Sequence, residues 1–495
     1  MRINKFAKIA AGALGVCVLF IVALIVMPVR DAPLPDSGTS RVIANVRVVD
    51  VVAGTVGPPT TVLIRDGMVA AIGEAQAPAD FPRMDAEGGY LVPAFWDMHV
   101  HTFQLSPQMH MPLWVANGVL NVRDMMGCPG ASDSLIACVD DKRRWNGNVA
   151  AGHMSAPRIV EAASFYFEAP DMTPEQARDR ASAYADRGVD ALKVYNSLSP
   201  QAFAAVADEA RAQRLRLVGH LPKAVALEDA LVAGQASFEH AHILPRHCFA
   251  GAAAWREGSL DDKIPVKLTE AVVDGFETGR CDAAFDAMRE AGAWLVPTHV
   301  TRNEDARAKD AAYLEDPRLD YLDPLSRWAL GDDLGAVATR YPGARGELAL
   351  VRYFEHGLKL TGRAHAAGVG VLVGTDSTIG GFRYHDEMAN LVRAGMSPAD
   401  VLRAATIDAA RYSGMEATSG SIAPGKRADL VLLSANPLDD IAATRDIAAV
   451  VQGGRLYDRQ RLDDLLAFTR DQVGTPHIWV KLVWGFARSS VSSEL

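Results

Sequence analysis

Six side chains that can bind a metal ion, or act beside one, follow one another along the chain, each in its own strand-like stretch. They are His99 and His101 in FWDMHVHTF, Lys193 in ALKVYNS, His220 in RLVGHLP, His240 in SFEHAH and Asp376 in VLVGTDS. A chain with only 13 histidines is not expected to place them in this way by chance. Their order predicts a two-metal hydrolytic centre distributed around a barrel.

The spacing within these stretches suits shared ligands. His99 and His101 lie two residues apart, so in a strand both side chains point to the same side and can bind one ion. The other candidates come late in their strand-like segments, and the carboxyl ends of barrel strands are where residues from distant positions converge. A pair of histidines alone is a weak signal, whereas the complete ordered set is a strong one.

The elements that must position these residues can be read from the alternation of strand-like and helical segments. The segment 173–188 is typical of the helices, with Thr173 as N-cap and Pro174 in the first turn. Eight strands each followed by a helix predict an α/β fold, a (β/α)8 TIM barrel over residues 93–417. The expected strands lie near 91–98, 118–125, 156–163, 191–197, 216–221, 237–242, 293–300 and 370–377.

Both ends of the chain differ from this middle part. Residues 41–92 and 418–465 alternate apolar and polar residues and break at Gly and Pro, which indicates short antiparallel strands. We expect them to form one small β-sandwich from both chain ends. Residues 466–495 form an apolar tail, for which the sequence leaves open a place in a membrane interface or packing against the barrel.

The N-terminal segment 1–29 has an uncharged run from Ile9 to Val29, preceded by Arg2, Lys5 and Lys8. This length predicts a transmembrane helix with its N-terminus in the cytoplasm, followed by a linker over 30–40. The anchor would place the catalytic domain on the periplasmic or extracellular side. Secretion after cleavage of a signal peptide and a cytoplasmic protein are the alternatives.

Cysteine content and charge add two further expectations. In an oxidising compartment, the cysteines outside the first segment would pair as Cys128–Cys138 and Cys248–Cys281, although four unpaired buried thiols are also compatible with the sequence. The net charge of −10, without a basic cluster, argues against a nucleic-acid partner.

Several longer motifs resemble those of the amidohydrolase superfamily of metal-dependent hydrolases. They are LVPAFWDMHVH, NGVLNVRDMMG, LVGTDS, EMANLVRAGMSPADVLRAATIDAARYSG and GSIAPGKRADLVLLSANPLDDI, so the resemblance covers nearly all of the chain after the linker. The pattern looks most like the branch that holds imidazolonepropionases and Xaa-Pro dipeptidases. It departs from that branch in PAFWD, in LNVRD and in His299, which occupies a position that is usually apolar.

The resemblance implies a division of the ligands between two divalent ions. His99, His101 and Asp376 would hold the first ion, and His220 and His240 the second. Zinc is the default for such a ligand set, with manganese, cobalt or iron as alternatives.

The resemblance also gives Lys193 and Asp376 chemical roles. Lys193 would bridge the two ions as a carbamate formed with carbon dioxide, because an ammonium group cannot bind a cation. A hydroxide bridging the ions would attack the substrate, and Asp376 would be the general base. The presence of Lys193 favours the binuclear, dipeptidase-like side of the branch; the alternative is an ordinary salt bridge.

The remaining candidates have supporting roles. Tyr195 and His299 are expected to contact substrate, or else to be buried hydrogen-bonded residues. Asp97 is expected to orient a ligand histidine or its strand, and His385 to support the loop after the eighth strand. A substrate carboxylate would need a cationic side chain to bind it, and the sequence does not show which one. The candidates for that cation are Arg123, which otherwise fixes a loop together with Asp124, and Arg246, Arg302 and Arg383.

The predicted function is cleavage of an amide bond in a small substrate, namely an Xaa-Pro or other dipeptide or an N-acyl amino acid. A cyclic amidase or lactonase on the same scaffold is the second enzyme hypothesis. An inactive metal-binding protein is the alternative outside catalysis, and it is expected to lack Asp376 or Lys193. The sequence leaves the exact substrate undetermined and a homo-oligomer possible.

Overall fold

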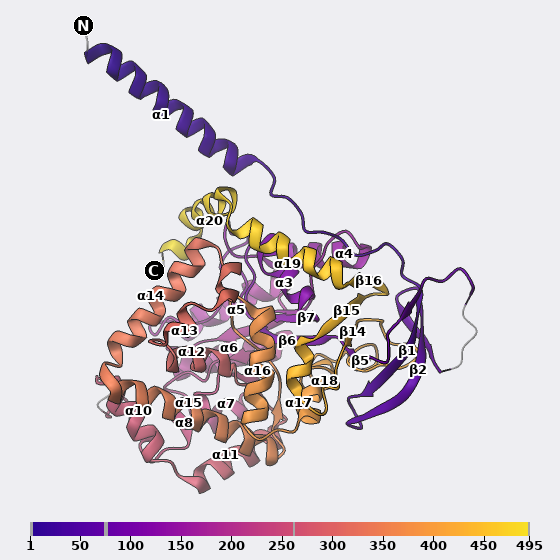
Figure 1. Cartoon of the computed structure of the whole chain (residues 1–495). Coiled ribbons are helices and arrows are strands. Elements are labelled where there is room, and N and C mark those ends of the chain that lie inside the picture. The colour runs from indigo at the N-terminus through magenta and orange to yellow at the C-terminus, as the bar shows by residue number, and fades with distance from the viewer. Residues whose placement is uncertain (1–2, 74–77, 261–262, 494–495) are drawn as a thin grey trace.

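The computed structural model describes residues 3–73, 78–260 and 263–493. A core of parallel strands is surrounded by helices, and a separate sheet stands at one side of this body (Figure 1). The core strands run parallel in chain order and are buried along most of their length, as sheets covered by helices on their outer face must be.

Eight short strands make up this core. They form a three-stranded sheet, β6-β7-β8, and a five-stranded sheet, β13-β12-β11-β10-β9. Their bounds are β6 Phe95–Val100, β7 Val119–Asp124, β8 Arg158–Ala162, β9 Ala191–Val194, β10 Arg216–Gly219, β11 Gln235–Glu239, β12 Trp294–Val296 and β13 Gly370–Val371.

The two sheets meet at both of their edges. On one side, parallel bridges join Ala163 to Ala191 and Phe167 to Val194, which links the end of β8 to β9. On the other side, the Met98 amide of β6 donates to the carbonyl of Val373, which follows β13, at 2.9 Å. All eight carboxyl ends therefore open toward one face of the molecule.

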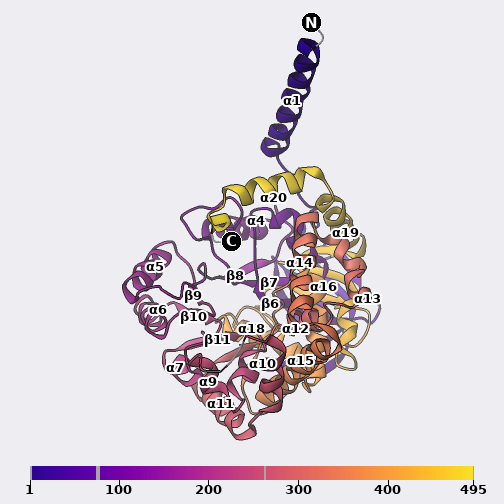
Figure 2. The same cartoon turned by 90° about the vertical axis from the view of Figure 1, so that its left-hand side faces the viewer.

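Helices pack around this core, as Figure 2 shows from a second side. The intervals after β11 and β12 are long and carry several helices each. Thr173 caps α5 by accepting from the Gln176 amide, as expected. The helices are α1 Ile3–Val26, α2 Ser106–Met109, α3 Met111–Ala116, α4 Val139–Ala151, α5 Pro174–Asp186, α6 Pro200–Gln213, α7 Leu227–Val232, α8 Ile243–His247, α9 Ala252–Arg256, α10 Pro265–Asp274, α11 Thr278–Ala291, α12 His299–Ala306, α13 Ala311–Leu314, α14 Pro324–Arg340, α15 Gly343–Ala366, α16 Gly380–Arg393, α17 Pro398–Ala404, α18 Ile407–Tyr412, α19 Arg459–Val473 and α20 Pro476–Arg488.

Strands from both ends of the chain form one eight-stranded sheet. Its order is β16-β15-β14-β5-β1-β2-β3, with β4 paired to β1, so the N-terminal strands meet the C-terminal ones where β5 pairs with β14. The bounds are β1 Arg41–Asp50, β2 Thr55–Arg65, β3 Met68–Ile72, β4 Arg83–Asp85, β5 Tyr90–Pro93, β14 Leu430–Leu433, β15 Ile447–Gln452 and β16 Arg455–Asp458.

The prediction of a transmembrane helix is wrong. Over the described ranges, no helix combines the length and the apolar character needed to cross a membrane. A bilayer core requires about 20 consecutive apolar residues, and the side chains of α1 are described only from residue 12 to Val26. The basic flank of Arg2, Lys5 and Lys8 lies outside the described side chains. The membrane-anchored location inferred from this segment is therefore not supported.

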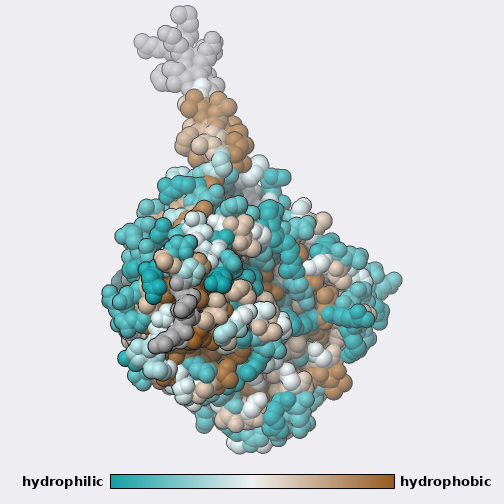
Figure 3. Space-filling view, turned by 90° about the vertical axis from the view of Figure 1, so that its right-hand side faces the viewer, coloured by the Kyte–Doolittle hydropathy of each residue, from teal (hydrophilic) through white to brown (hydrophobic). Residues whose placement is uncertain are grey.

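The C-terminal tail packs against the body and against the end of α1. Ile478 and Leu482 of α20 lie in a cluster with Met109 and Val473. Lys481 Nζ donates to the carbonyl of Ile25 at 2.6 Å. The described part of α1 then extends away from the body as an exposed stalk (Figure 3).

Both expected disulfides are formed. One joins Cys128 to Cys138 in the segment before α4, and the other joins Cys248, directly after α8, to Cys281 in α11. The second bond encloses the described part of the segment that carries α9 and α10.

Candidate metal centre

The candidate ligands come together at the carboxyl ends of the core strands. His99 lies near the end of β6 and His101 just after it, and Lys193 lies in β9. His220 directly follows β10 and His240 directly follows β11, whereas Asp376 comes five residues after Val371 at the end of β13. His99 and Lys193 are thus held within strands, and the other four candidates lie in the segments that follow strands.

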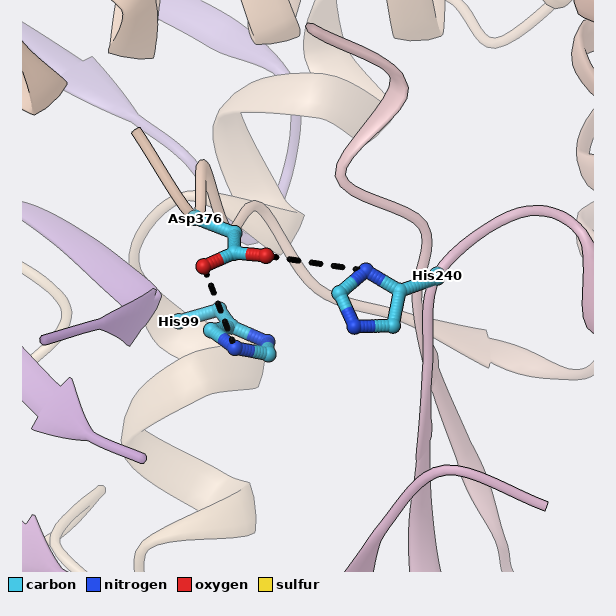
Figure 4. A group of neighbouring side chains, drawn as sticks. All are labelled: His99, His240 and Asp376. Atoms are coloured by element: carbon cyan, nitrogen blue, oxygen red, sulfur yellow. Dashed lines mark ion pairs between the residues drawn. The ribbon is translucent and has the colours of Figure 1, made fainter. Parts of the chain in front are cut away.

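His99, His240 and Asp376 form the centre of the group, with one ligand atom from each lying within 4.8 Å of the others (Figure 4). Asp376 Oδ1 is 3.7 Å from His99 Nε2, and its Oδ2 is 3.9 Å from His240 Nδ1. His101 joins them, with its Nε2 3.1 Å from Asp376 Oδ1 and 3.3 Å from His99 Nε2. Four donors therefore face one small volume.

His220, Lys193 and Tyr195 lie on the other side of His240. The His220 ring centroid is 4.4 Å from that of His240 and 4.0 Å from that of Tyr195. Lys193 is buried, with its Nζ 6.0 Å from the Tyr195 ring centroid. Within the described residues, His220 Nδ1 is buried without a hydrogen-bond partner. Such an unpaired nitrogen is costly unless something binds it.

The protonation states of this group suit a cation. Burial lowers the pKa of His99 and takes that of His240 to about 3, so both rings are neutral. Burial also lowers the pKa of Lys193, against the pull of Asp376. For Asp376, burial is outweighed by His99 and His101, which hold its pKa well below the usual value. Metal ligands must be deprotonated, and the donor set present therefore fits divalent ions.

A buried ion pair behind His99 was not anticipated as part of the site. Glu239 Oε2 lies 3.0 Å from His99 Nδ1, and both its oxygens accept from Arg123 Nη2, at 2.8 and 2.9 Å. Burial would raise the pKa of Glu239, but Arg123 and His99 hold it at about 2. An ionised carboxylate only accepts, so Nδ1 of His99 carries the proton and Nε2 presents its lone pair to the site.

Three residues at or beside these strand ends have a strained backbone. His240, Thr298 and Asp376 are non-glycine residues with positive φ, of 76°, 45° and 50°. Such conformations cost free energy and persist where surrounding contacts fix them. The turn at His240 breaks the side-chain alternation of β11, so that both Glu239 and His240 serve the site. Thr298 Oγ1 lies 2.8 Å from His240 Nδ1.

Asp97 ties the first strand of the core to the segment after the last. Its carboxylate accepts from the His99 amide at 3.2 Å, from the Thr375 amide at 2.9 Å and from Thr375 Oγ1 at 2.7 Å. These bonds position the residue next to Asp376. Asp97 therefore contacts the backbone of one ligand and the neighbour of another.

Two of the candidate histidines are not part of the cluster. His299 is buried, with its Nε2 3.0 Å from Thr361 Oγ1 and its amide donating to Glu387. His385 lies in α16 with its Nδ1 2.9 Å from Thr444 Oγ1, and its ring packs edge-on against Phe95. The partners of both histidines are residues that pack in or around the core, and none of them is a candidate metal ligand.

The model of the amidohydrolase family matches residues 90–457, which is most of the chain and includes every candidate ligand. The chain belongs to the amidohydrolase family. The match confirms the superfamily predicted from the motifs and, with it, the class of hydrolases that act on carbon–nitrogen bonds.

Individual relatives of this amidohydrolase are distant. Ochratoxinase of Aspergillus niger is 35% identical over 104 residues, 20% of this chain and 22% of that protein. Imidazolonepropionase of Rhizorhabdus wittichii is 28% identical over 213 residues, 39% of this chain and 51% of that protein. The chain thus spans from about a fifth to about half of the length of these relatives.

A solved Xaa-Pro dipeptidase with bound methionine in its active site superposes on 85% of this amidohydrolase and on 100% of its own chain. Its TM-score is 0.57 at 17% identity. At this identity the likeness shows a shared fold alone.

A pocket adjoins the metal centre of this amidohydrolase. It has a volume of about 340 Å³ and is lined by residues that follow three ligand-bearing strands, among them Asn196, Leu221 and His242. Nothing in the residue pattern separated His242 from the other histidines, yet its ring lies 5.6 Å from that of His240 and nearly parallel to it. The signal available was its position two residues after a ligand.

Proposed function

We propose that this chain hydrolyses an amide bond of a small substrate, using two divalent ions with zinc as the default, held by His99, His101, His220, His240 and Asp376. The observation that carries the proposal is the convergence of His99, His240 and Asp376, with ligand atoms within 4.8 Å of one another, at the strand ends of an amidohydrolase. A dipeptide, including Xaa-Pro, or an N-acyl amino acid is the proposed substrate. The dipeptidase resemblance supports this choice.

Lys193 is proposed to bridge the ions after reaction of its amine with carbon dioxide. Its burial favours the neutral amine, which is the form that reacts. The product would be a carboxylate placed between the ligands on either side of His240. Divalent ions at such a site lower the pKa of a water molecule and polarise the substrate carbonyl.

Asp376 is the proposed general base. Its side chain is 29% exposed, whereas those of His99 and His240 are 0% and 8% exposed, so it can reach both water and substrate. Asp376 would take a proton from the attacking water and pass it to the amide nitrogen. The oxygen of that water joins the carbonyl carbon, the C–N bond breaks, and an acid and an amine leave.

Tyr195 is proposed to donate a hydrogen bond to the substrate carbonyl oxygen. Burial raises the pKa of its hydroxyl to about 12, so it stays protonated at neutral pH. Its ring packs against that of His220, which places the phenol beside the cluster.

The test uses the full chain loaded with zinc or manganese in bicarbonate buffer. It is incubated with dipeptides, N-acyl amino acids and lactones, and substrate loss is followed by mass spectrometry. Asp376→Asn should lower amide turnover by at least about 10³-fold, since it removes both a base and a ligand, while the exposed Asp208→Asn should match wild type. Loss of lactones alone, or equal activity in Asp376→Asn, would contradict the proposal.

A further inference from the structure

A second cavity of the same volume, about 340 Å³, adjoins the pocket beside the metal centre. Lys223, Arg246 and Trp255 line both cavities. Both cations lie near Trp255, whose ring centroid is 5.4 Å from Arg246 Cζ and 5.3 Å from Lys223 Nζ. We call the two adjoining cavities together the side pocket, with each cavity as one lobe.

The lining of the side pocket combines apolar walls with positive charge. Leu221, Pro222 and Val225 line the first lobe, and Leu268, Val272 and Leu350 line the second. Arg256 lines the first lobe, and Arg302 and Arg340 the second, whereas Asp305 is the acidic residue among the lining side chains. Such a space favours an anion that carries an apolar group.

The structure distinguishes among the four arginines that follow core strands. Arg123 is fully buried and bound to Glu239. Arg383 forms an ion pair with Asp386 at 3.1 Å and lies near Asp316 and Glu304. Arg302 forms an ion pair with Asp305 at 2.7 Å. These three guanidinium groups are already neutralised by carboxylates of the chain.

Arg246 differs from them. In the part of the chain that the structure describes, its guanidinium contacts the Trp255 ring, and no carboxylate forms an ion pair with it. It is half-buried on α8, four residues after His242, whose ring stacks on that of the ligand His240. Tyr353 lines the second lobe, and its buried hydroxyl lies close to the Arg246 guanidinium.

We propose that Arg246 binds the carboxylate of the amino acid released by hydrolysis, and that Trp255 and the apolar walls hold its side chain. This assignment rests on the proposed function and narrows it to N-acyl amino acids and dipeptides with a free carboxylate and a bulky apolar C-terminal residue. A guanidinium group suits this role because it can donate two parallel hydrogen bonds to a carboxylate. Tyr353 offers a further donor.

The kinetic test compares two substrates that differ in the carboxylate alone, N-acetyl-L-phenylalanine and N-acetyl-2-phenylethylamine. The metal-loaded wild type should prefer the first. Arg246→Gln should lower kcat/KM for the first about 10- to 100-fold, mainly through KM, and leave the second unchanged, the range expected for a lost hydrogen bond to a charged group. Arg246→Lys should lie in between.

A matched control comes from the same neighbourhood. Arg352 precedes Tyr353 in α15 but is exposed and paired with Asp274. Arg352→Gln should behave as wild type with both substrates. Metal content and thermal unfolding of all variants should equal those of wild type, which separates a binding effect from misfolding.

A binding measurement separates this assignment from the proposed function. Calorimetric titration with 3-phenylpropanoate should show binding to wild type that is weakened at least about 10-fold in Arg246→Gln, and 3-phenylpropanamide should bind poorly to both. If neither acetyl compound is hydrolysed but this pattern holds, the amidase function fails for this class and the carboxylate site stands. Equal binding of 3-phenylpropanoate to both proteins, or equal hydrolysis of both substrates by wild type, would overturn the assignment to Arg246.

Discussion

Lys193 places one amine in a site that is otherwise built from imidazole and carboxylate groups. Burial and the positive charge of Arg123 make a bare ammonium costly there, against the attraction of Asp376 and Glu239. This explains chemically why a modified lysine is the expected form. The same reasoning makes Lys193 the residue whose removal should be most informative.

We predict that Lys193→Ala lowers metal content from two ions per chain to one or fewer, and that short carboxylic acids restore part of it. The reason is that acetate or formate can occupy the space of the lost carbamate. Elemental analysis of the dialysed protein measures this, with the exposed Lys359→Ala as control. Full metal content and rate in Lys193→Ala would rule out the bridging role.

A second prediction concerns Glu239 and the affinity of the site for metal. Glu239→Gln should lower metal affinity about 10- to 100-fold, because the residue behind a ligand histidine fixes its proton and orientation. It also leaves Arg123 without its full ion pair. Competition with a chelator measures the affinity, and Glu290→Gln on the surface of α11 serves as control. Unchanged affinity would show that the Glu239–Arg123 pair does not support His99.

Residue types along the chain were sufficient to propose the ligands, but not their partners. Glu239 adjoins His240 and would point away from it in a regular strand, so only the positive φ of His240 brings both to the site. Arg123, Arg302 and Arg383 could not be told from Arg246 by sequence, because their neutralisation depends on carboxylates brought close by folding.

At the scale of elements, β9 and β10 pack closely beside Lys193. Gly219 ends β10 with φ +120°, and a Cβ there would lie 2.3 Å from the Val194 carbonyl oxygen and 3.2 Å from Lys193 Cγ. A larger residue would have to push β9, and Lys193 with it, away from its neighbour.

Gly219→Ala should therefore destabilise the protein by about 2–4 kcal/mol, the sum expected for backbone strain and overpacking, and lower its metal content. Urea unfolding and elemental analysis measure the two effects. Gly395 has a similar φ of +105° with nothing within 4 Å of a Cβ, so Gly395→Ala isolates the strain. An equal cost for both variants would argue against a steric role for Gly219.

The junction of α2 and α3 provides a pH-dependent test. Burial lowers the pKa of His110 to about 4, while its Nδ1 lies 3.1 Å from Ser106 Oγ. The unfolded chain binds a proton at His110 below about pH 6.5, whereas burial keeps this imidazole neutral in the folded chain. Protonation therefore favours the unfolded chain, so the free energy of unfolding is highest above pH 6.5 and falls as the pH drops toward 4.

We expect wild type to lose up to about 1.4 kcal/mol of unfolding free energy per pH unit more than His110→Gln between pH 6.5 and 4. Urea titrations at several pH values measure the slope. His153→Gln, at an exposed position, should follow wild type. Parallel curves for wild type and His110→Gln would contradict the assignment.

The regular elements were more predictable than the intervals between them. Buried parallel strands appear as short apolar runs, and the expected ranges overlap the observed strands from β6 to β13. The sequence pattern did not place the individual helices after β11 and β12, because their packing depends on long-range contacts. The uncharged run at the N-terminus suggested a membrane span that the described helices do not provide.

At the scale of the whole molecule, the Cys248–Cys281 disulfide ties the segment that carries Trp255 to α11. Removing both cysteines (Cys248→Ala with Cys281→Ala) should cost about 2–5 kcal/mol of stability and raise KM for N-acetyl-L-phenylalanine more than it lowers kcat. The Cys128→Ala, Cys138→Ala pair should affect stability without a selective rise in KM. Equal effects of the two pairs on KM would show that the side pocket does not depend on this bond.

The pairing of β5 with β14 also has a consequence for how the protein is made. Pro93 lies opposite Leu430, so the first strands leave the ribosome long before their partner exists. At about 5–20 residues per second, the wait amounts to roughly 20–70 s. During that time Leu91 and Val92 form an open apolar sheet edge, which is a template for aggregation. Interrupted synthesis is therefore expected to yield insoluble fragments rather than a partly active enzyme.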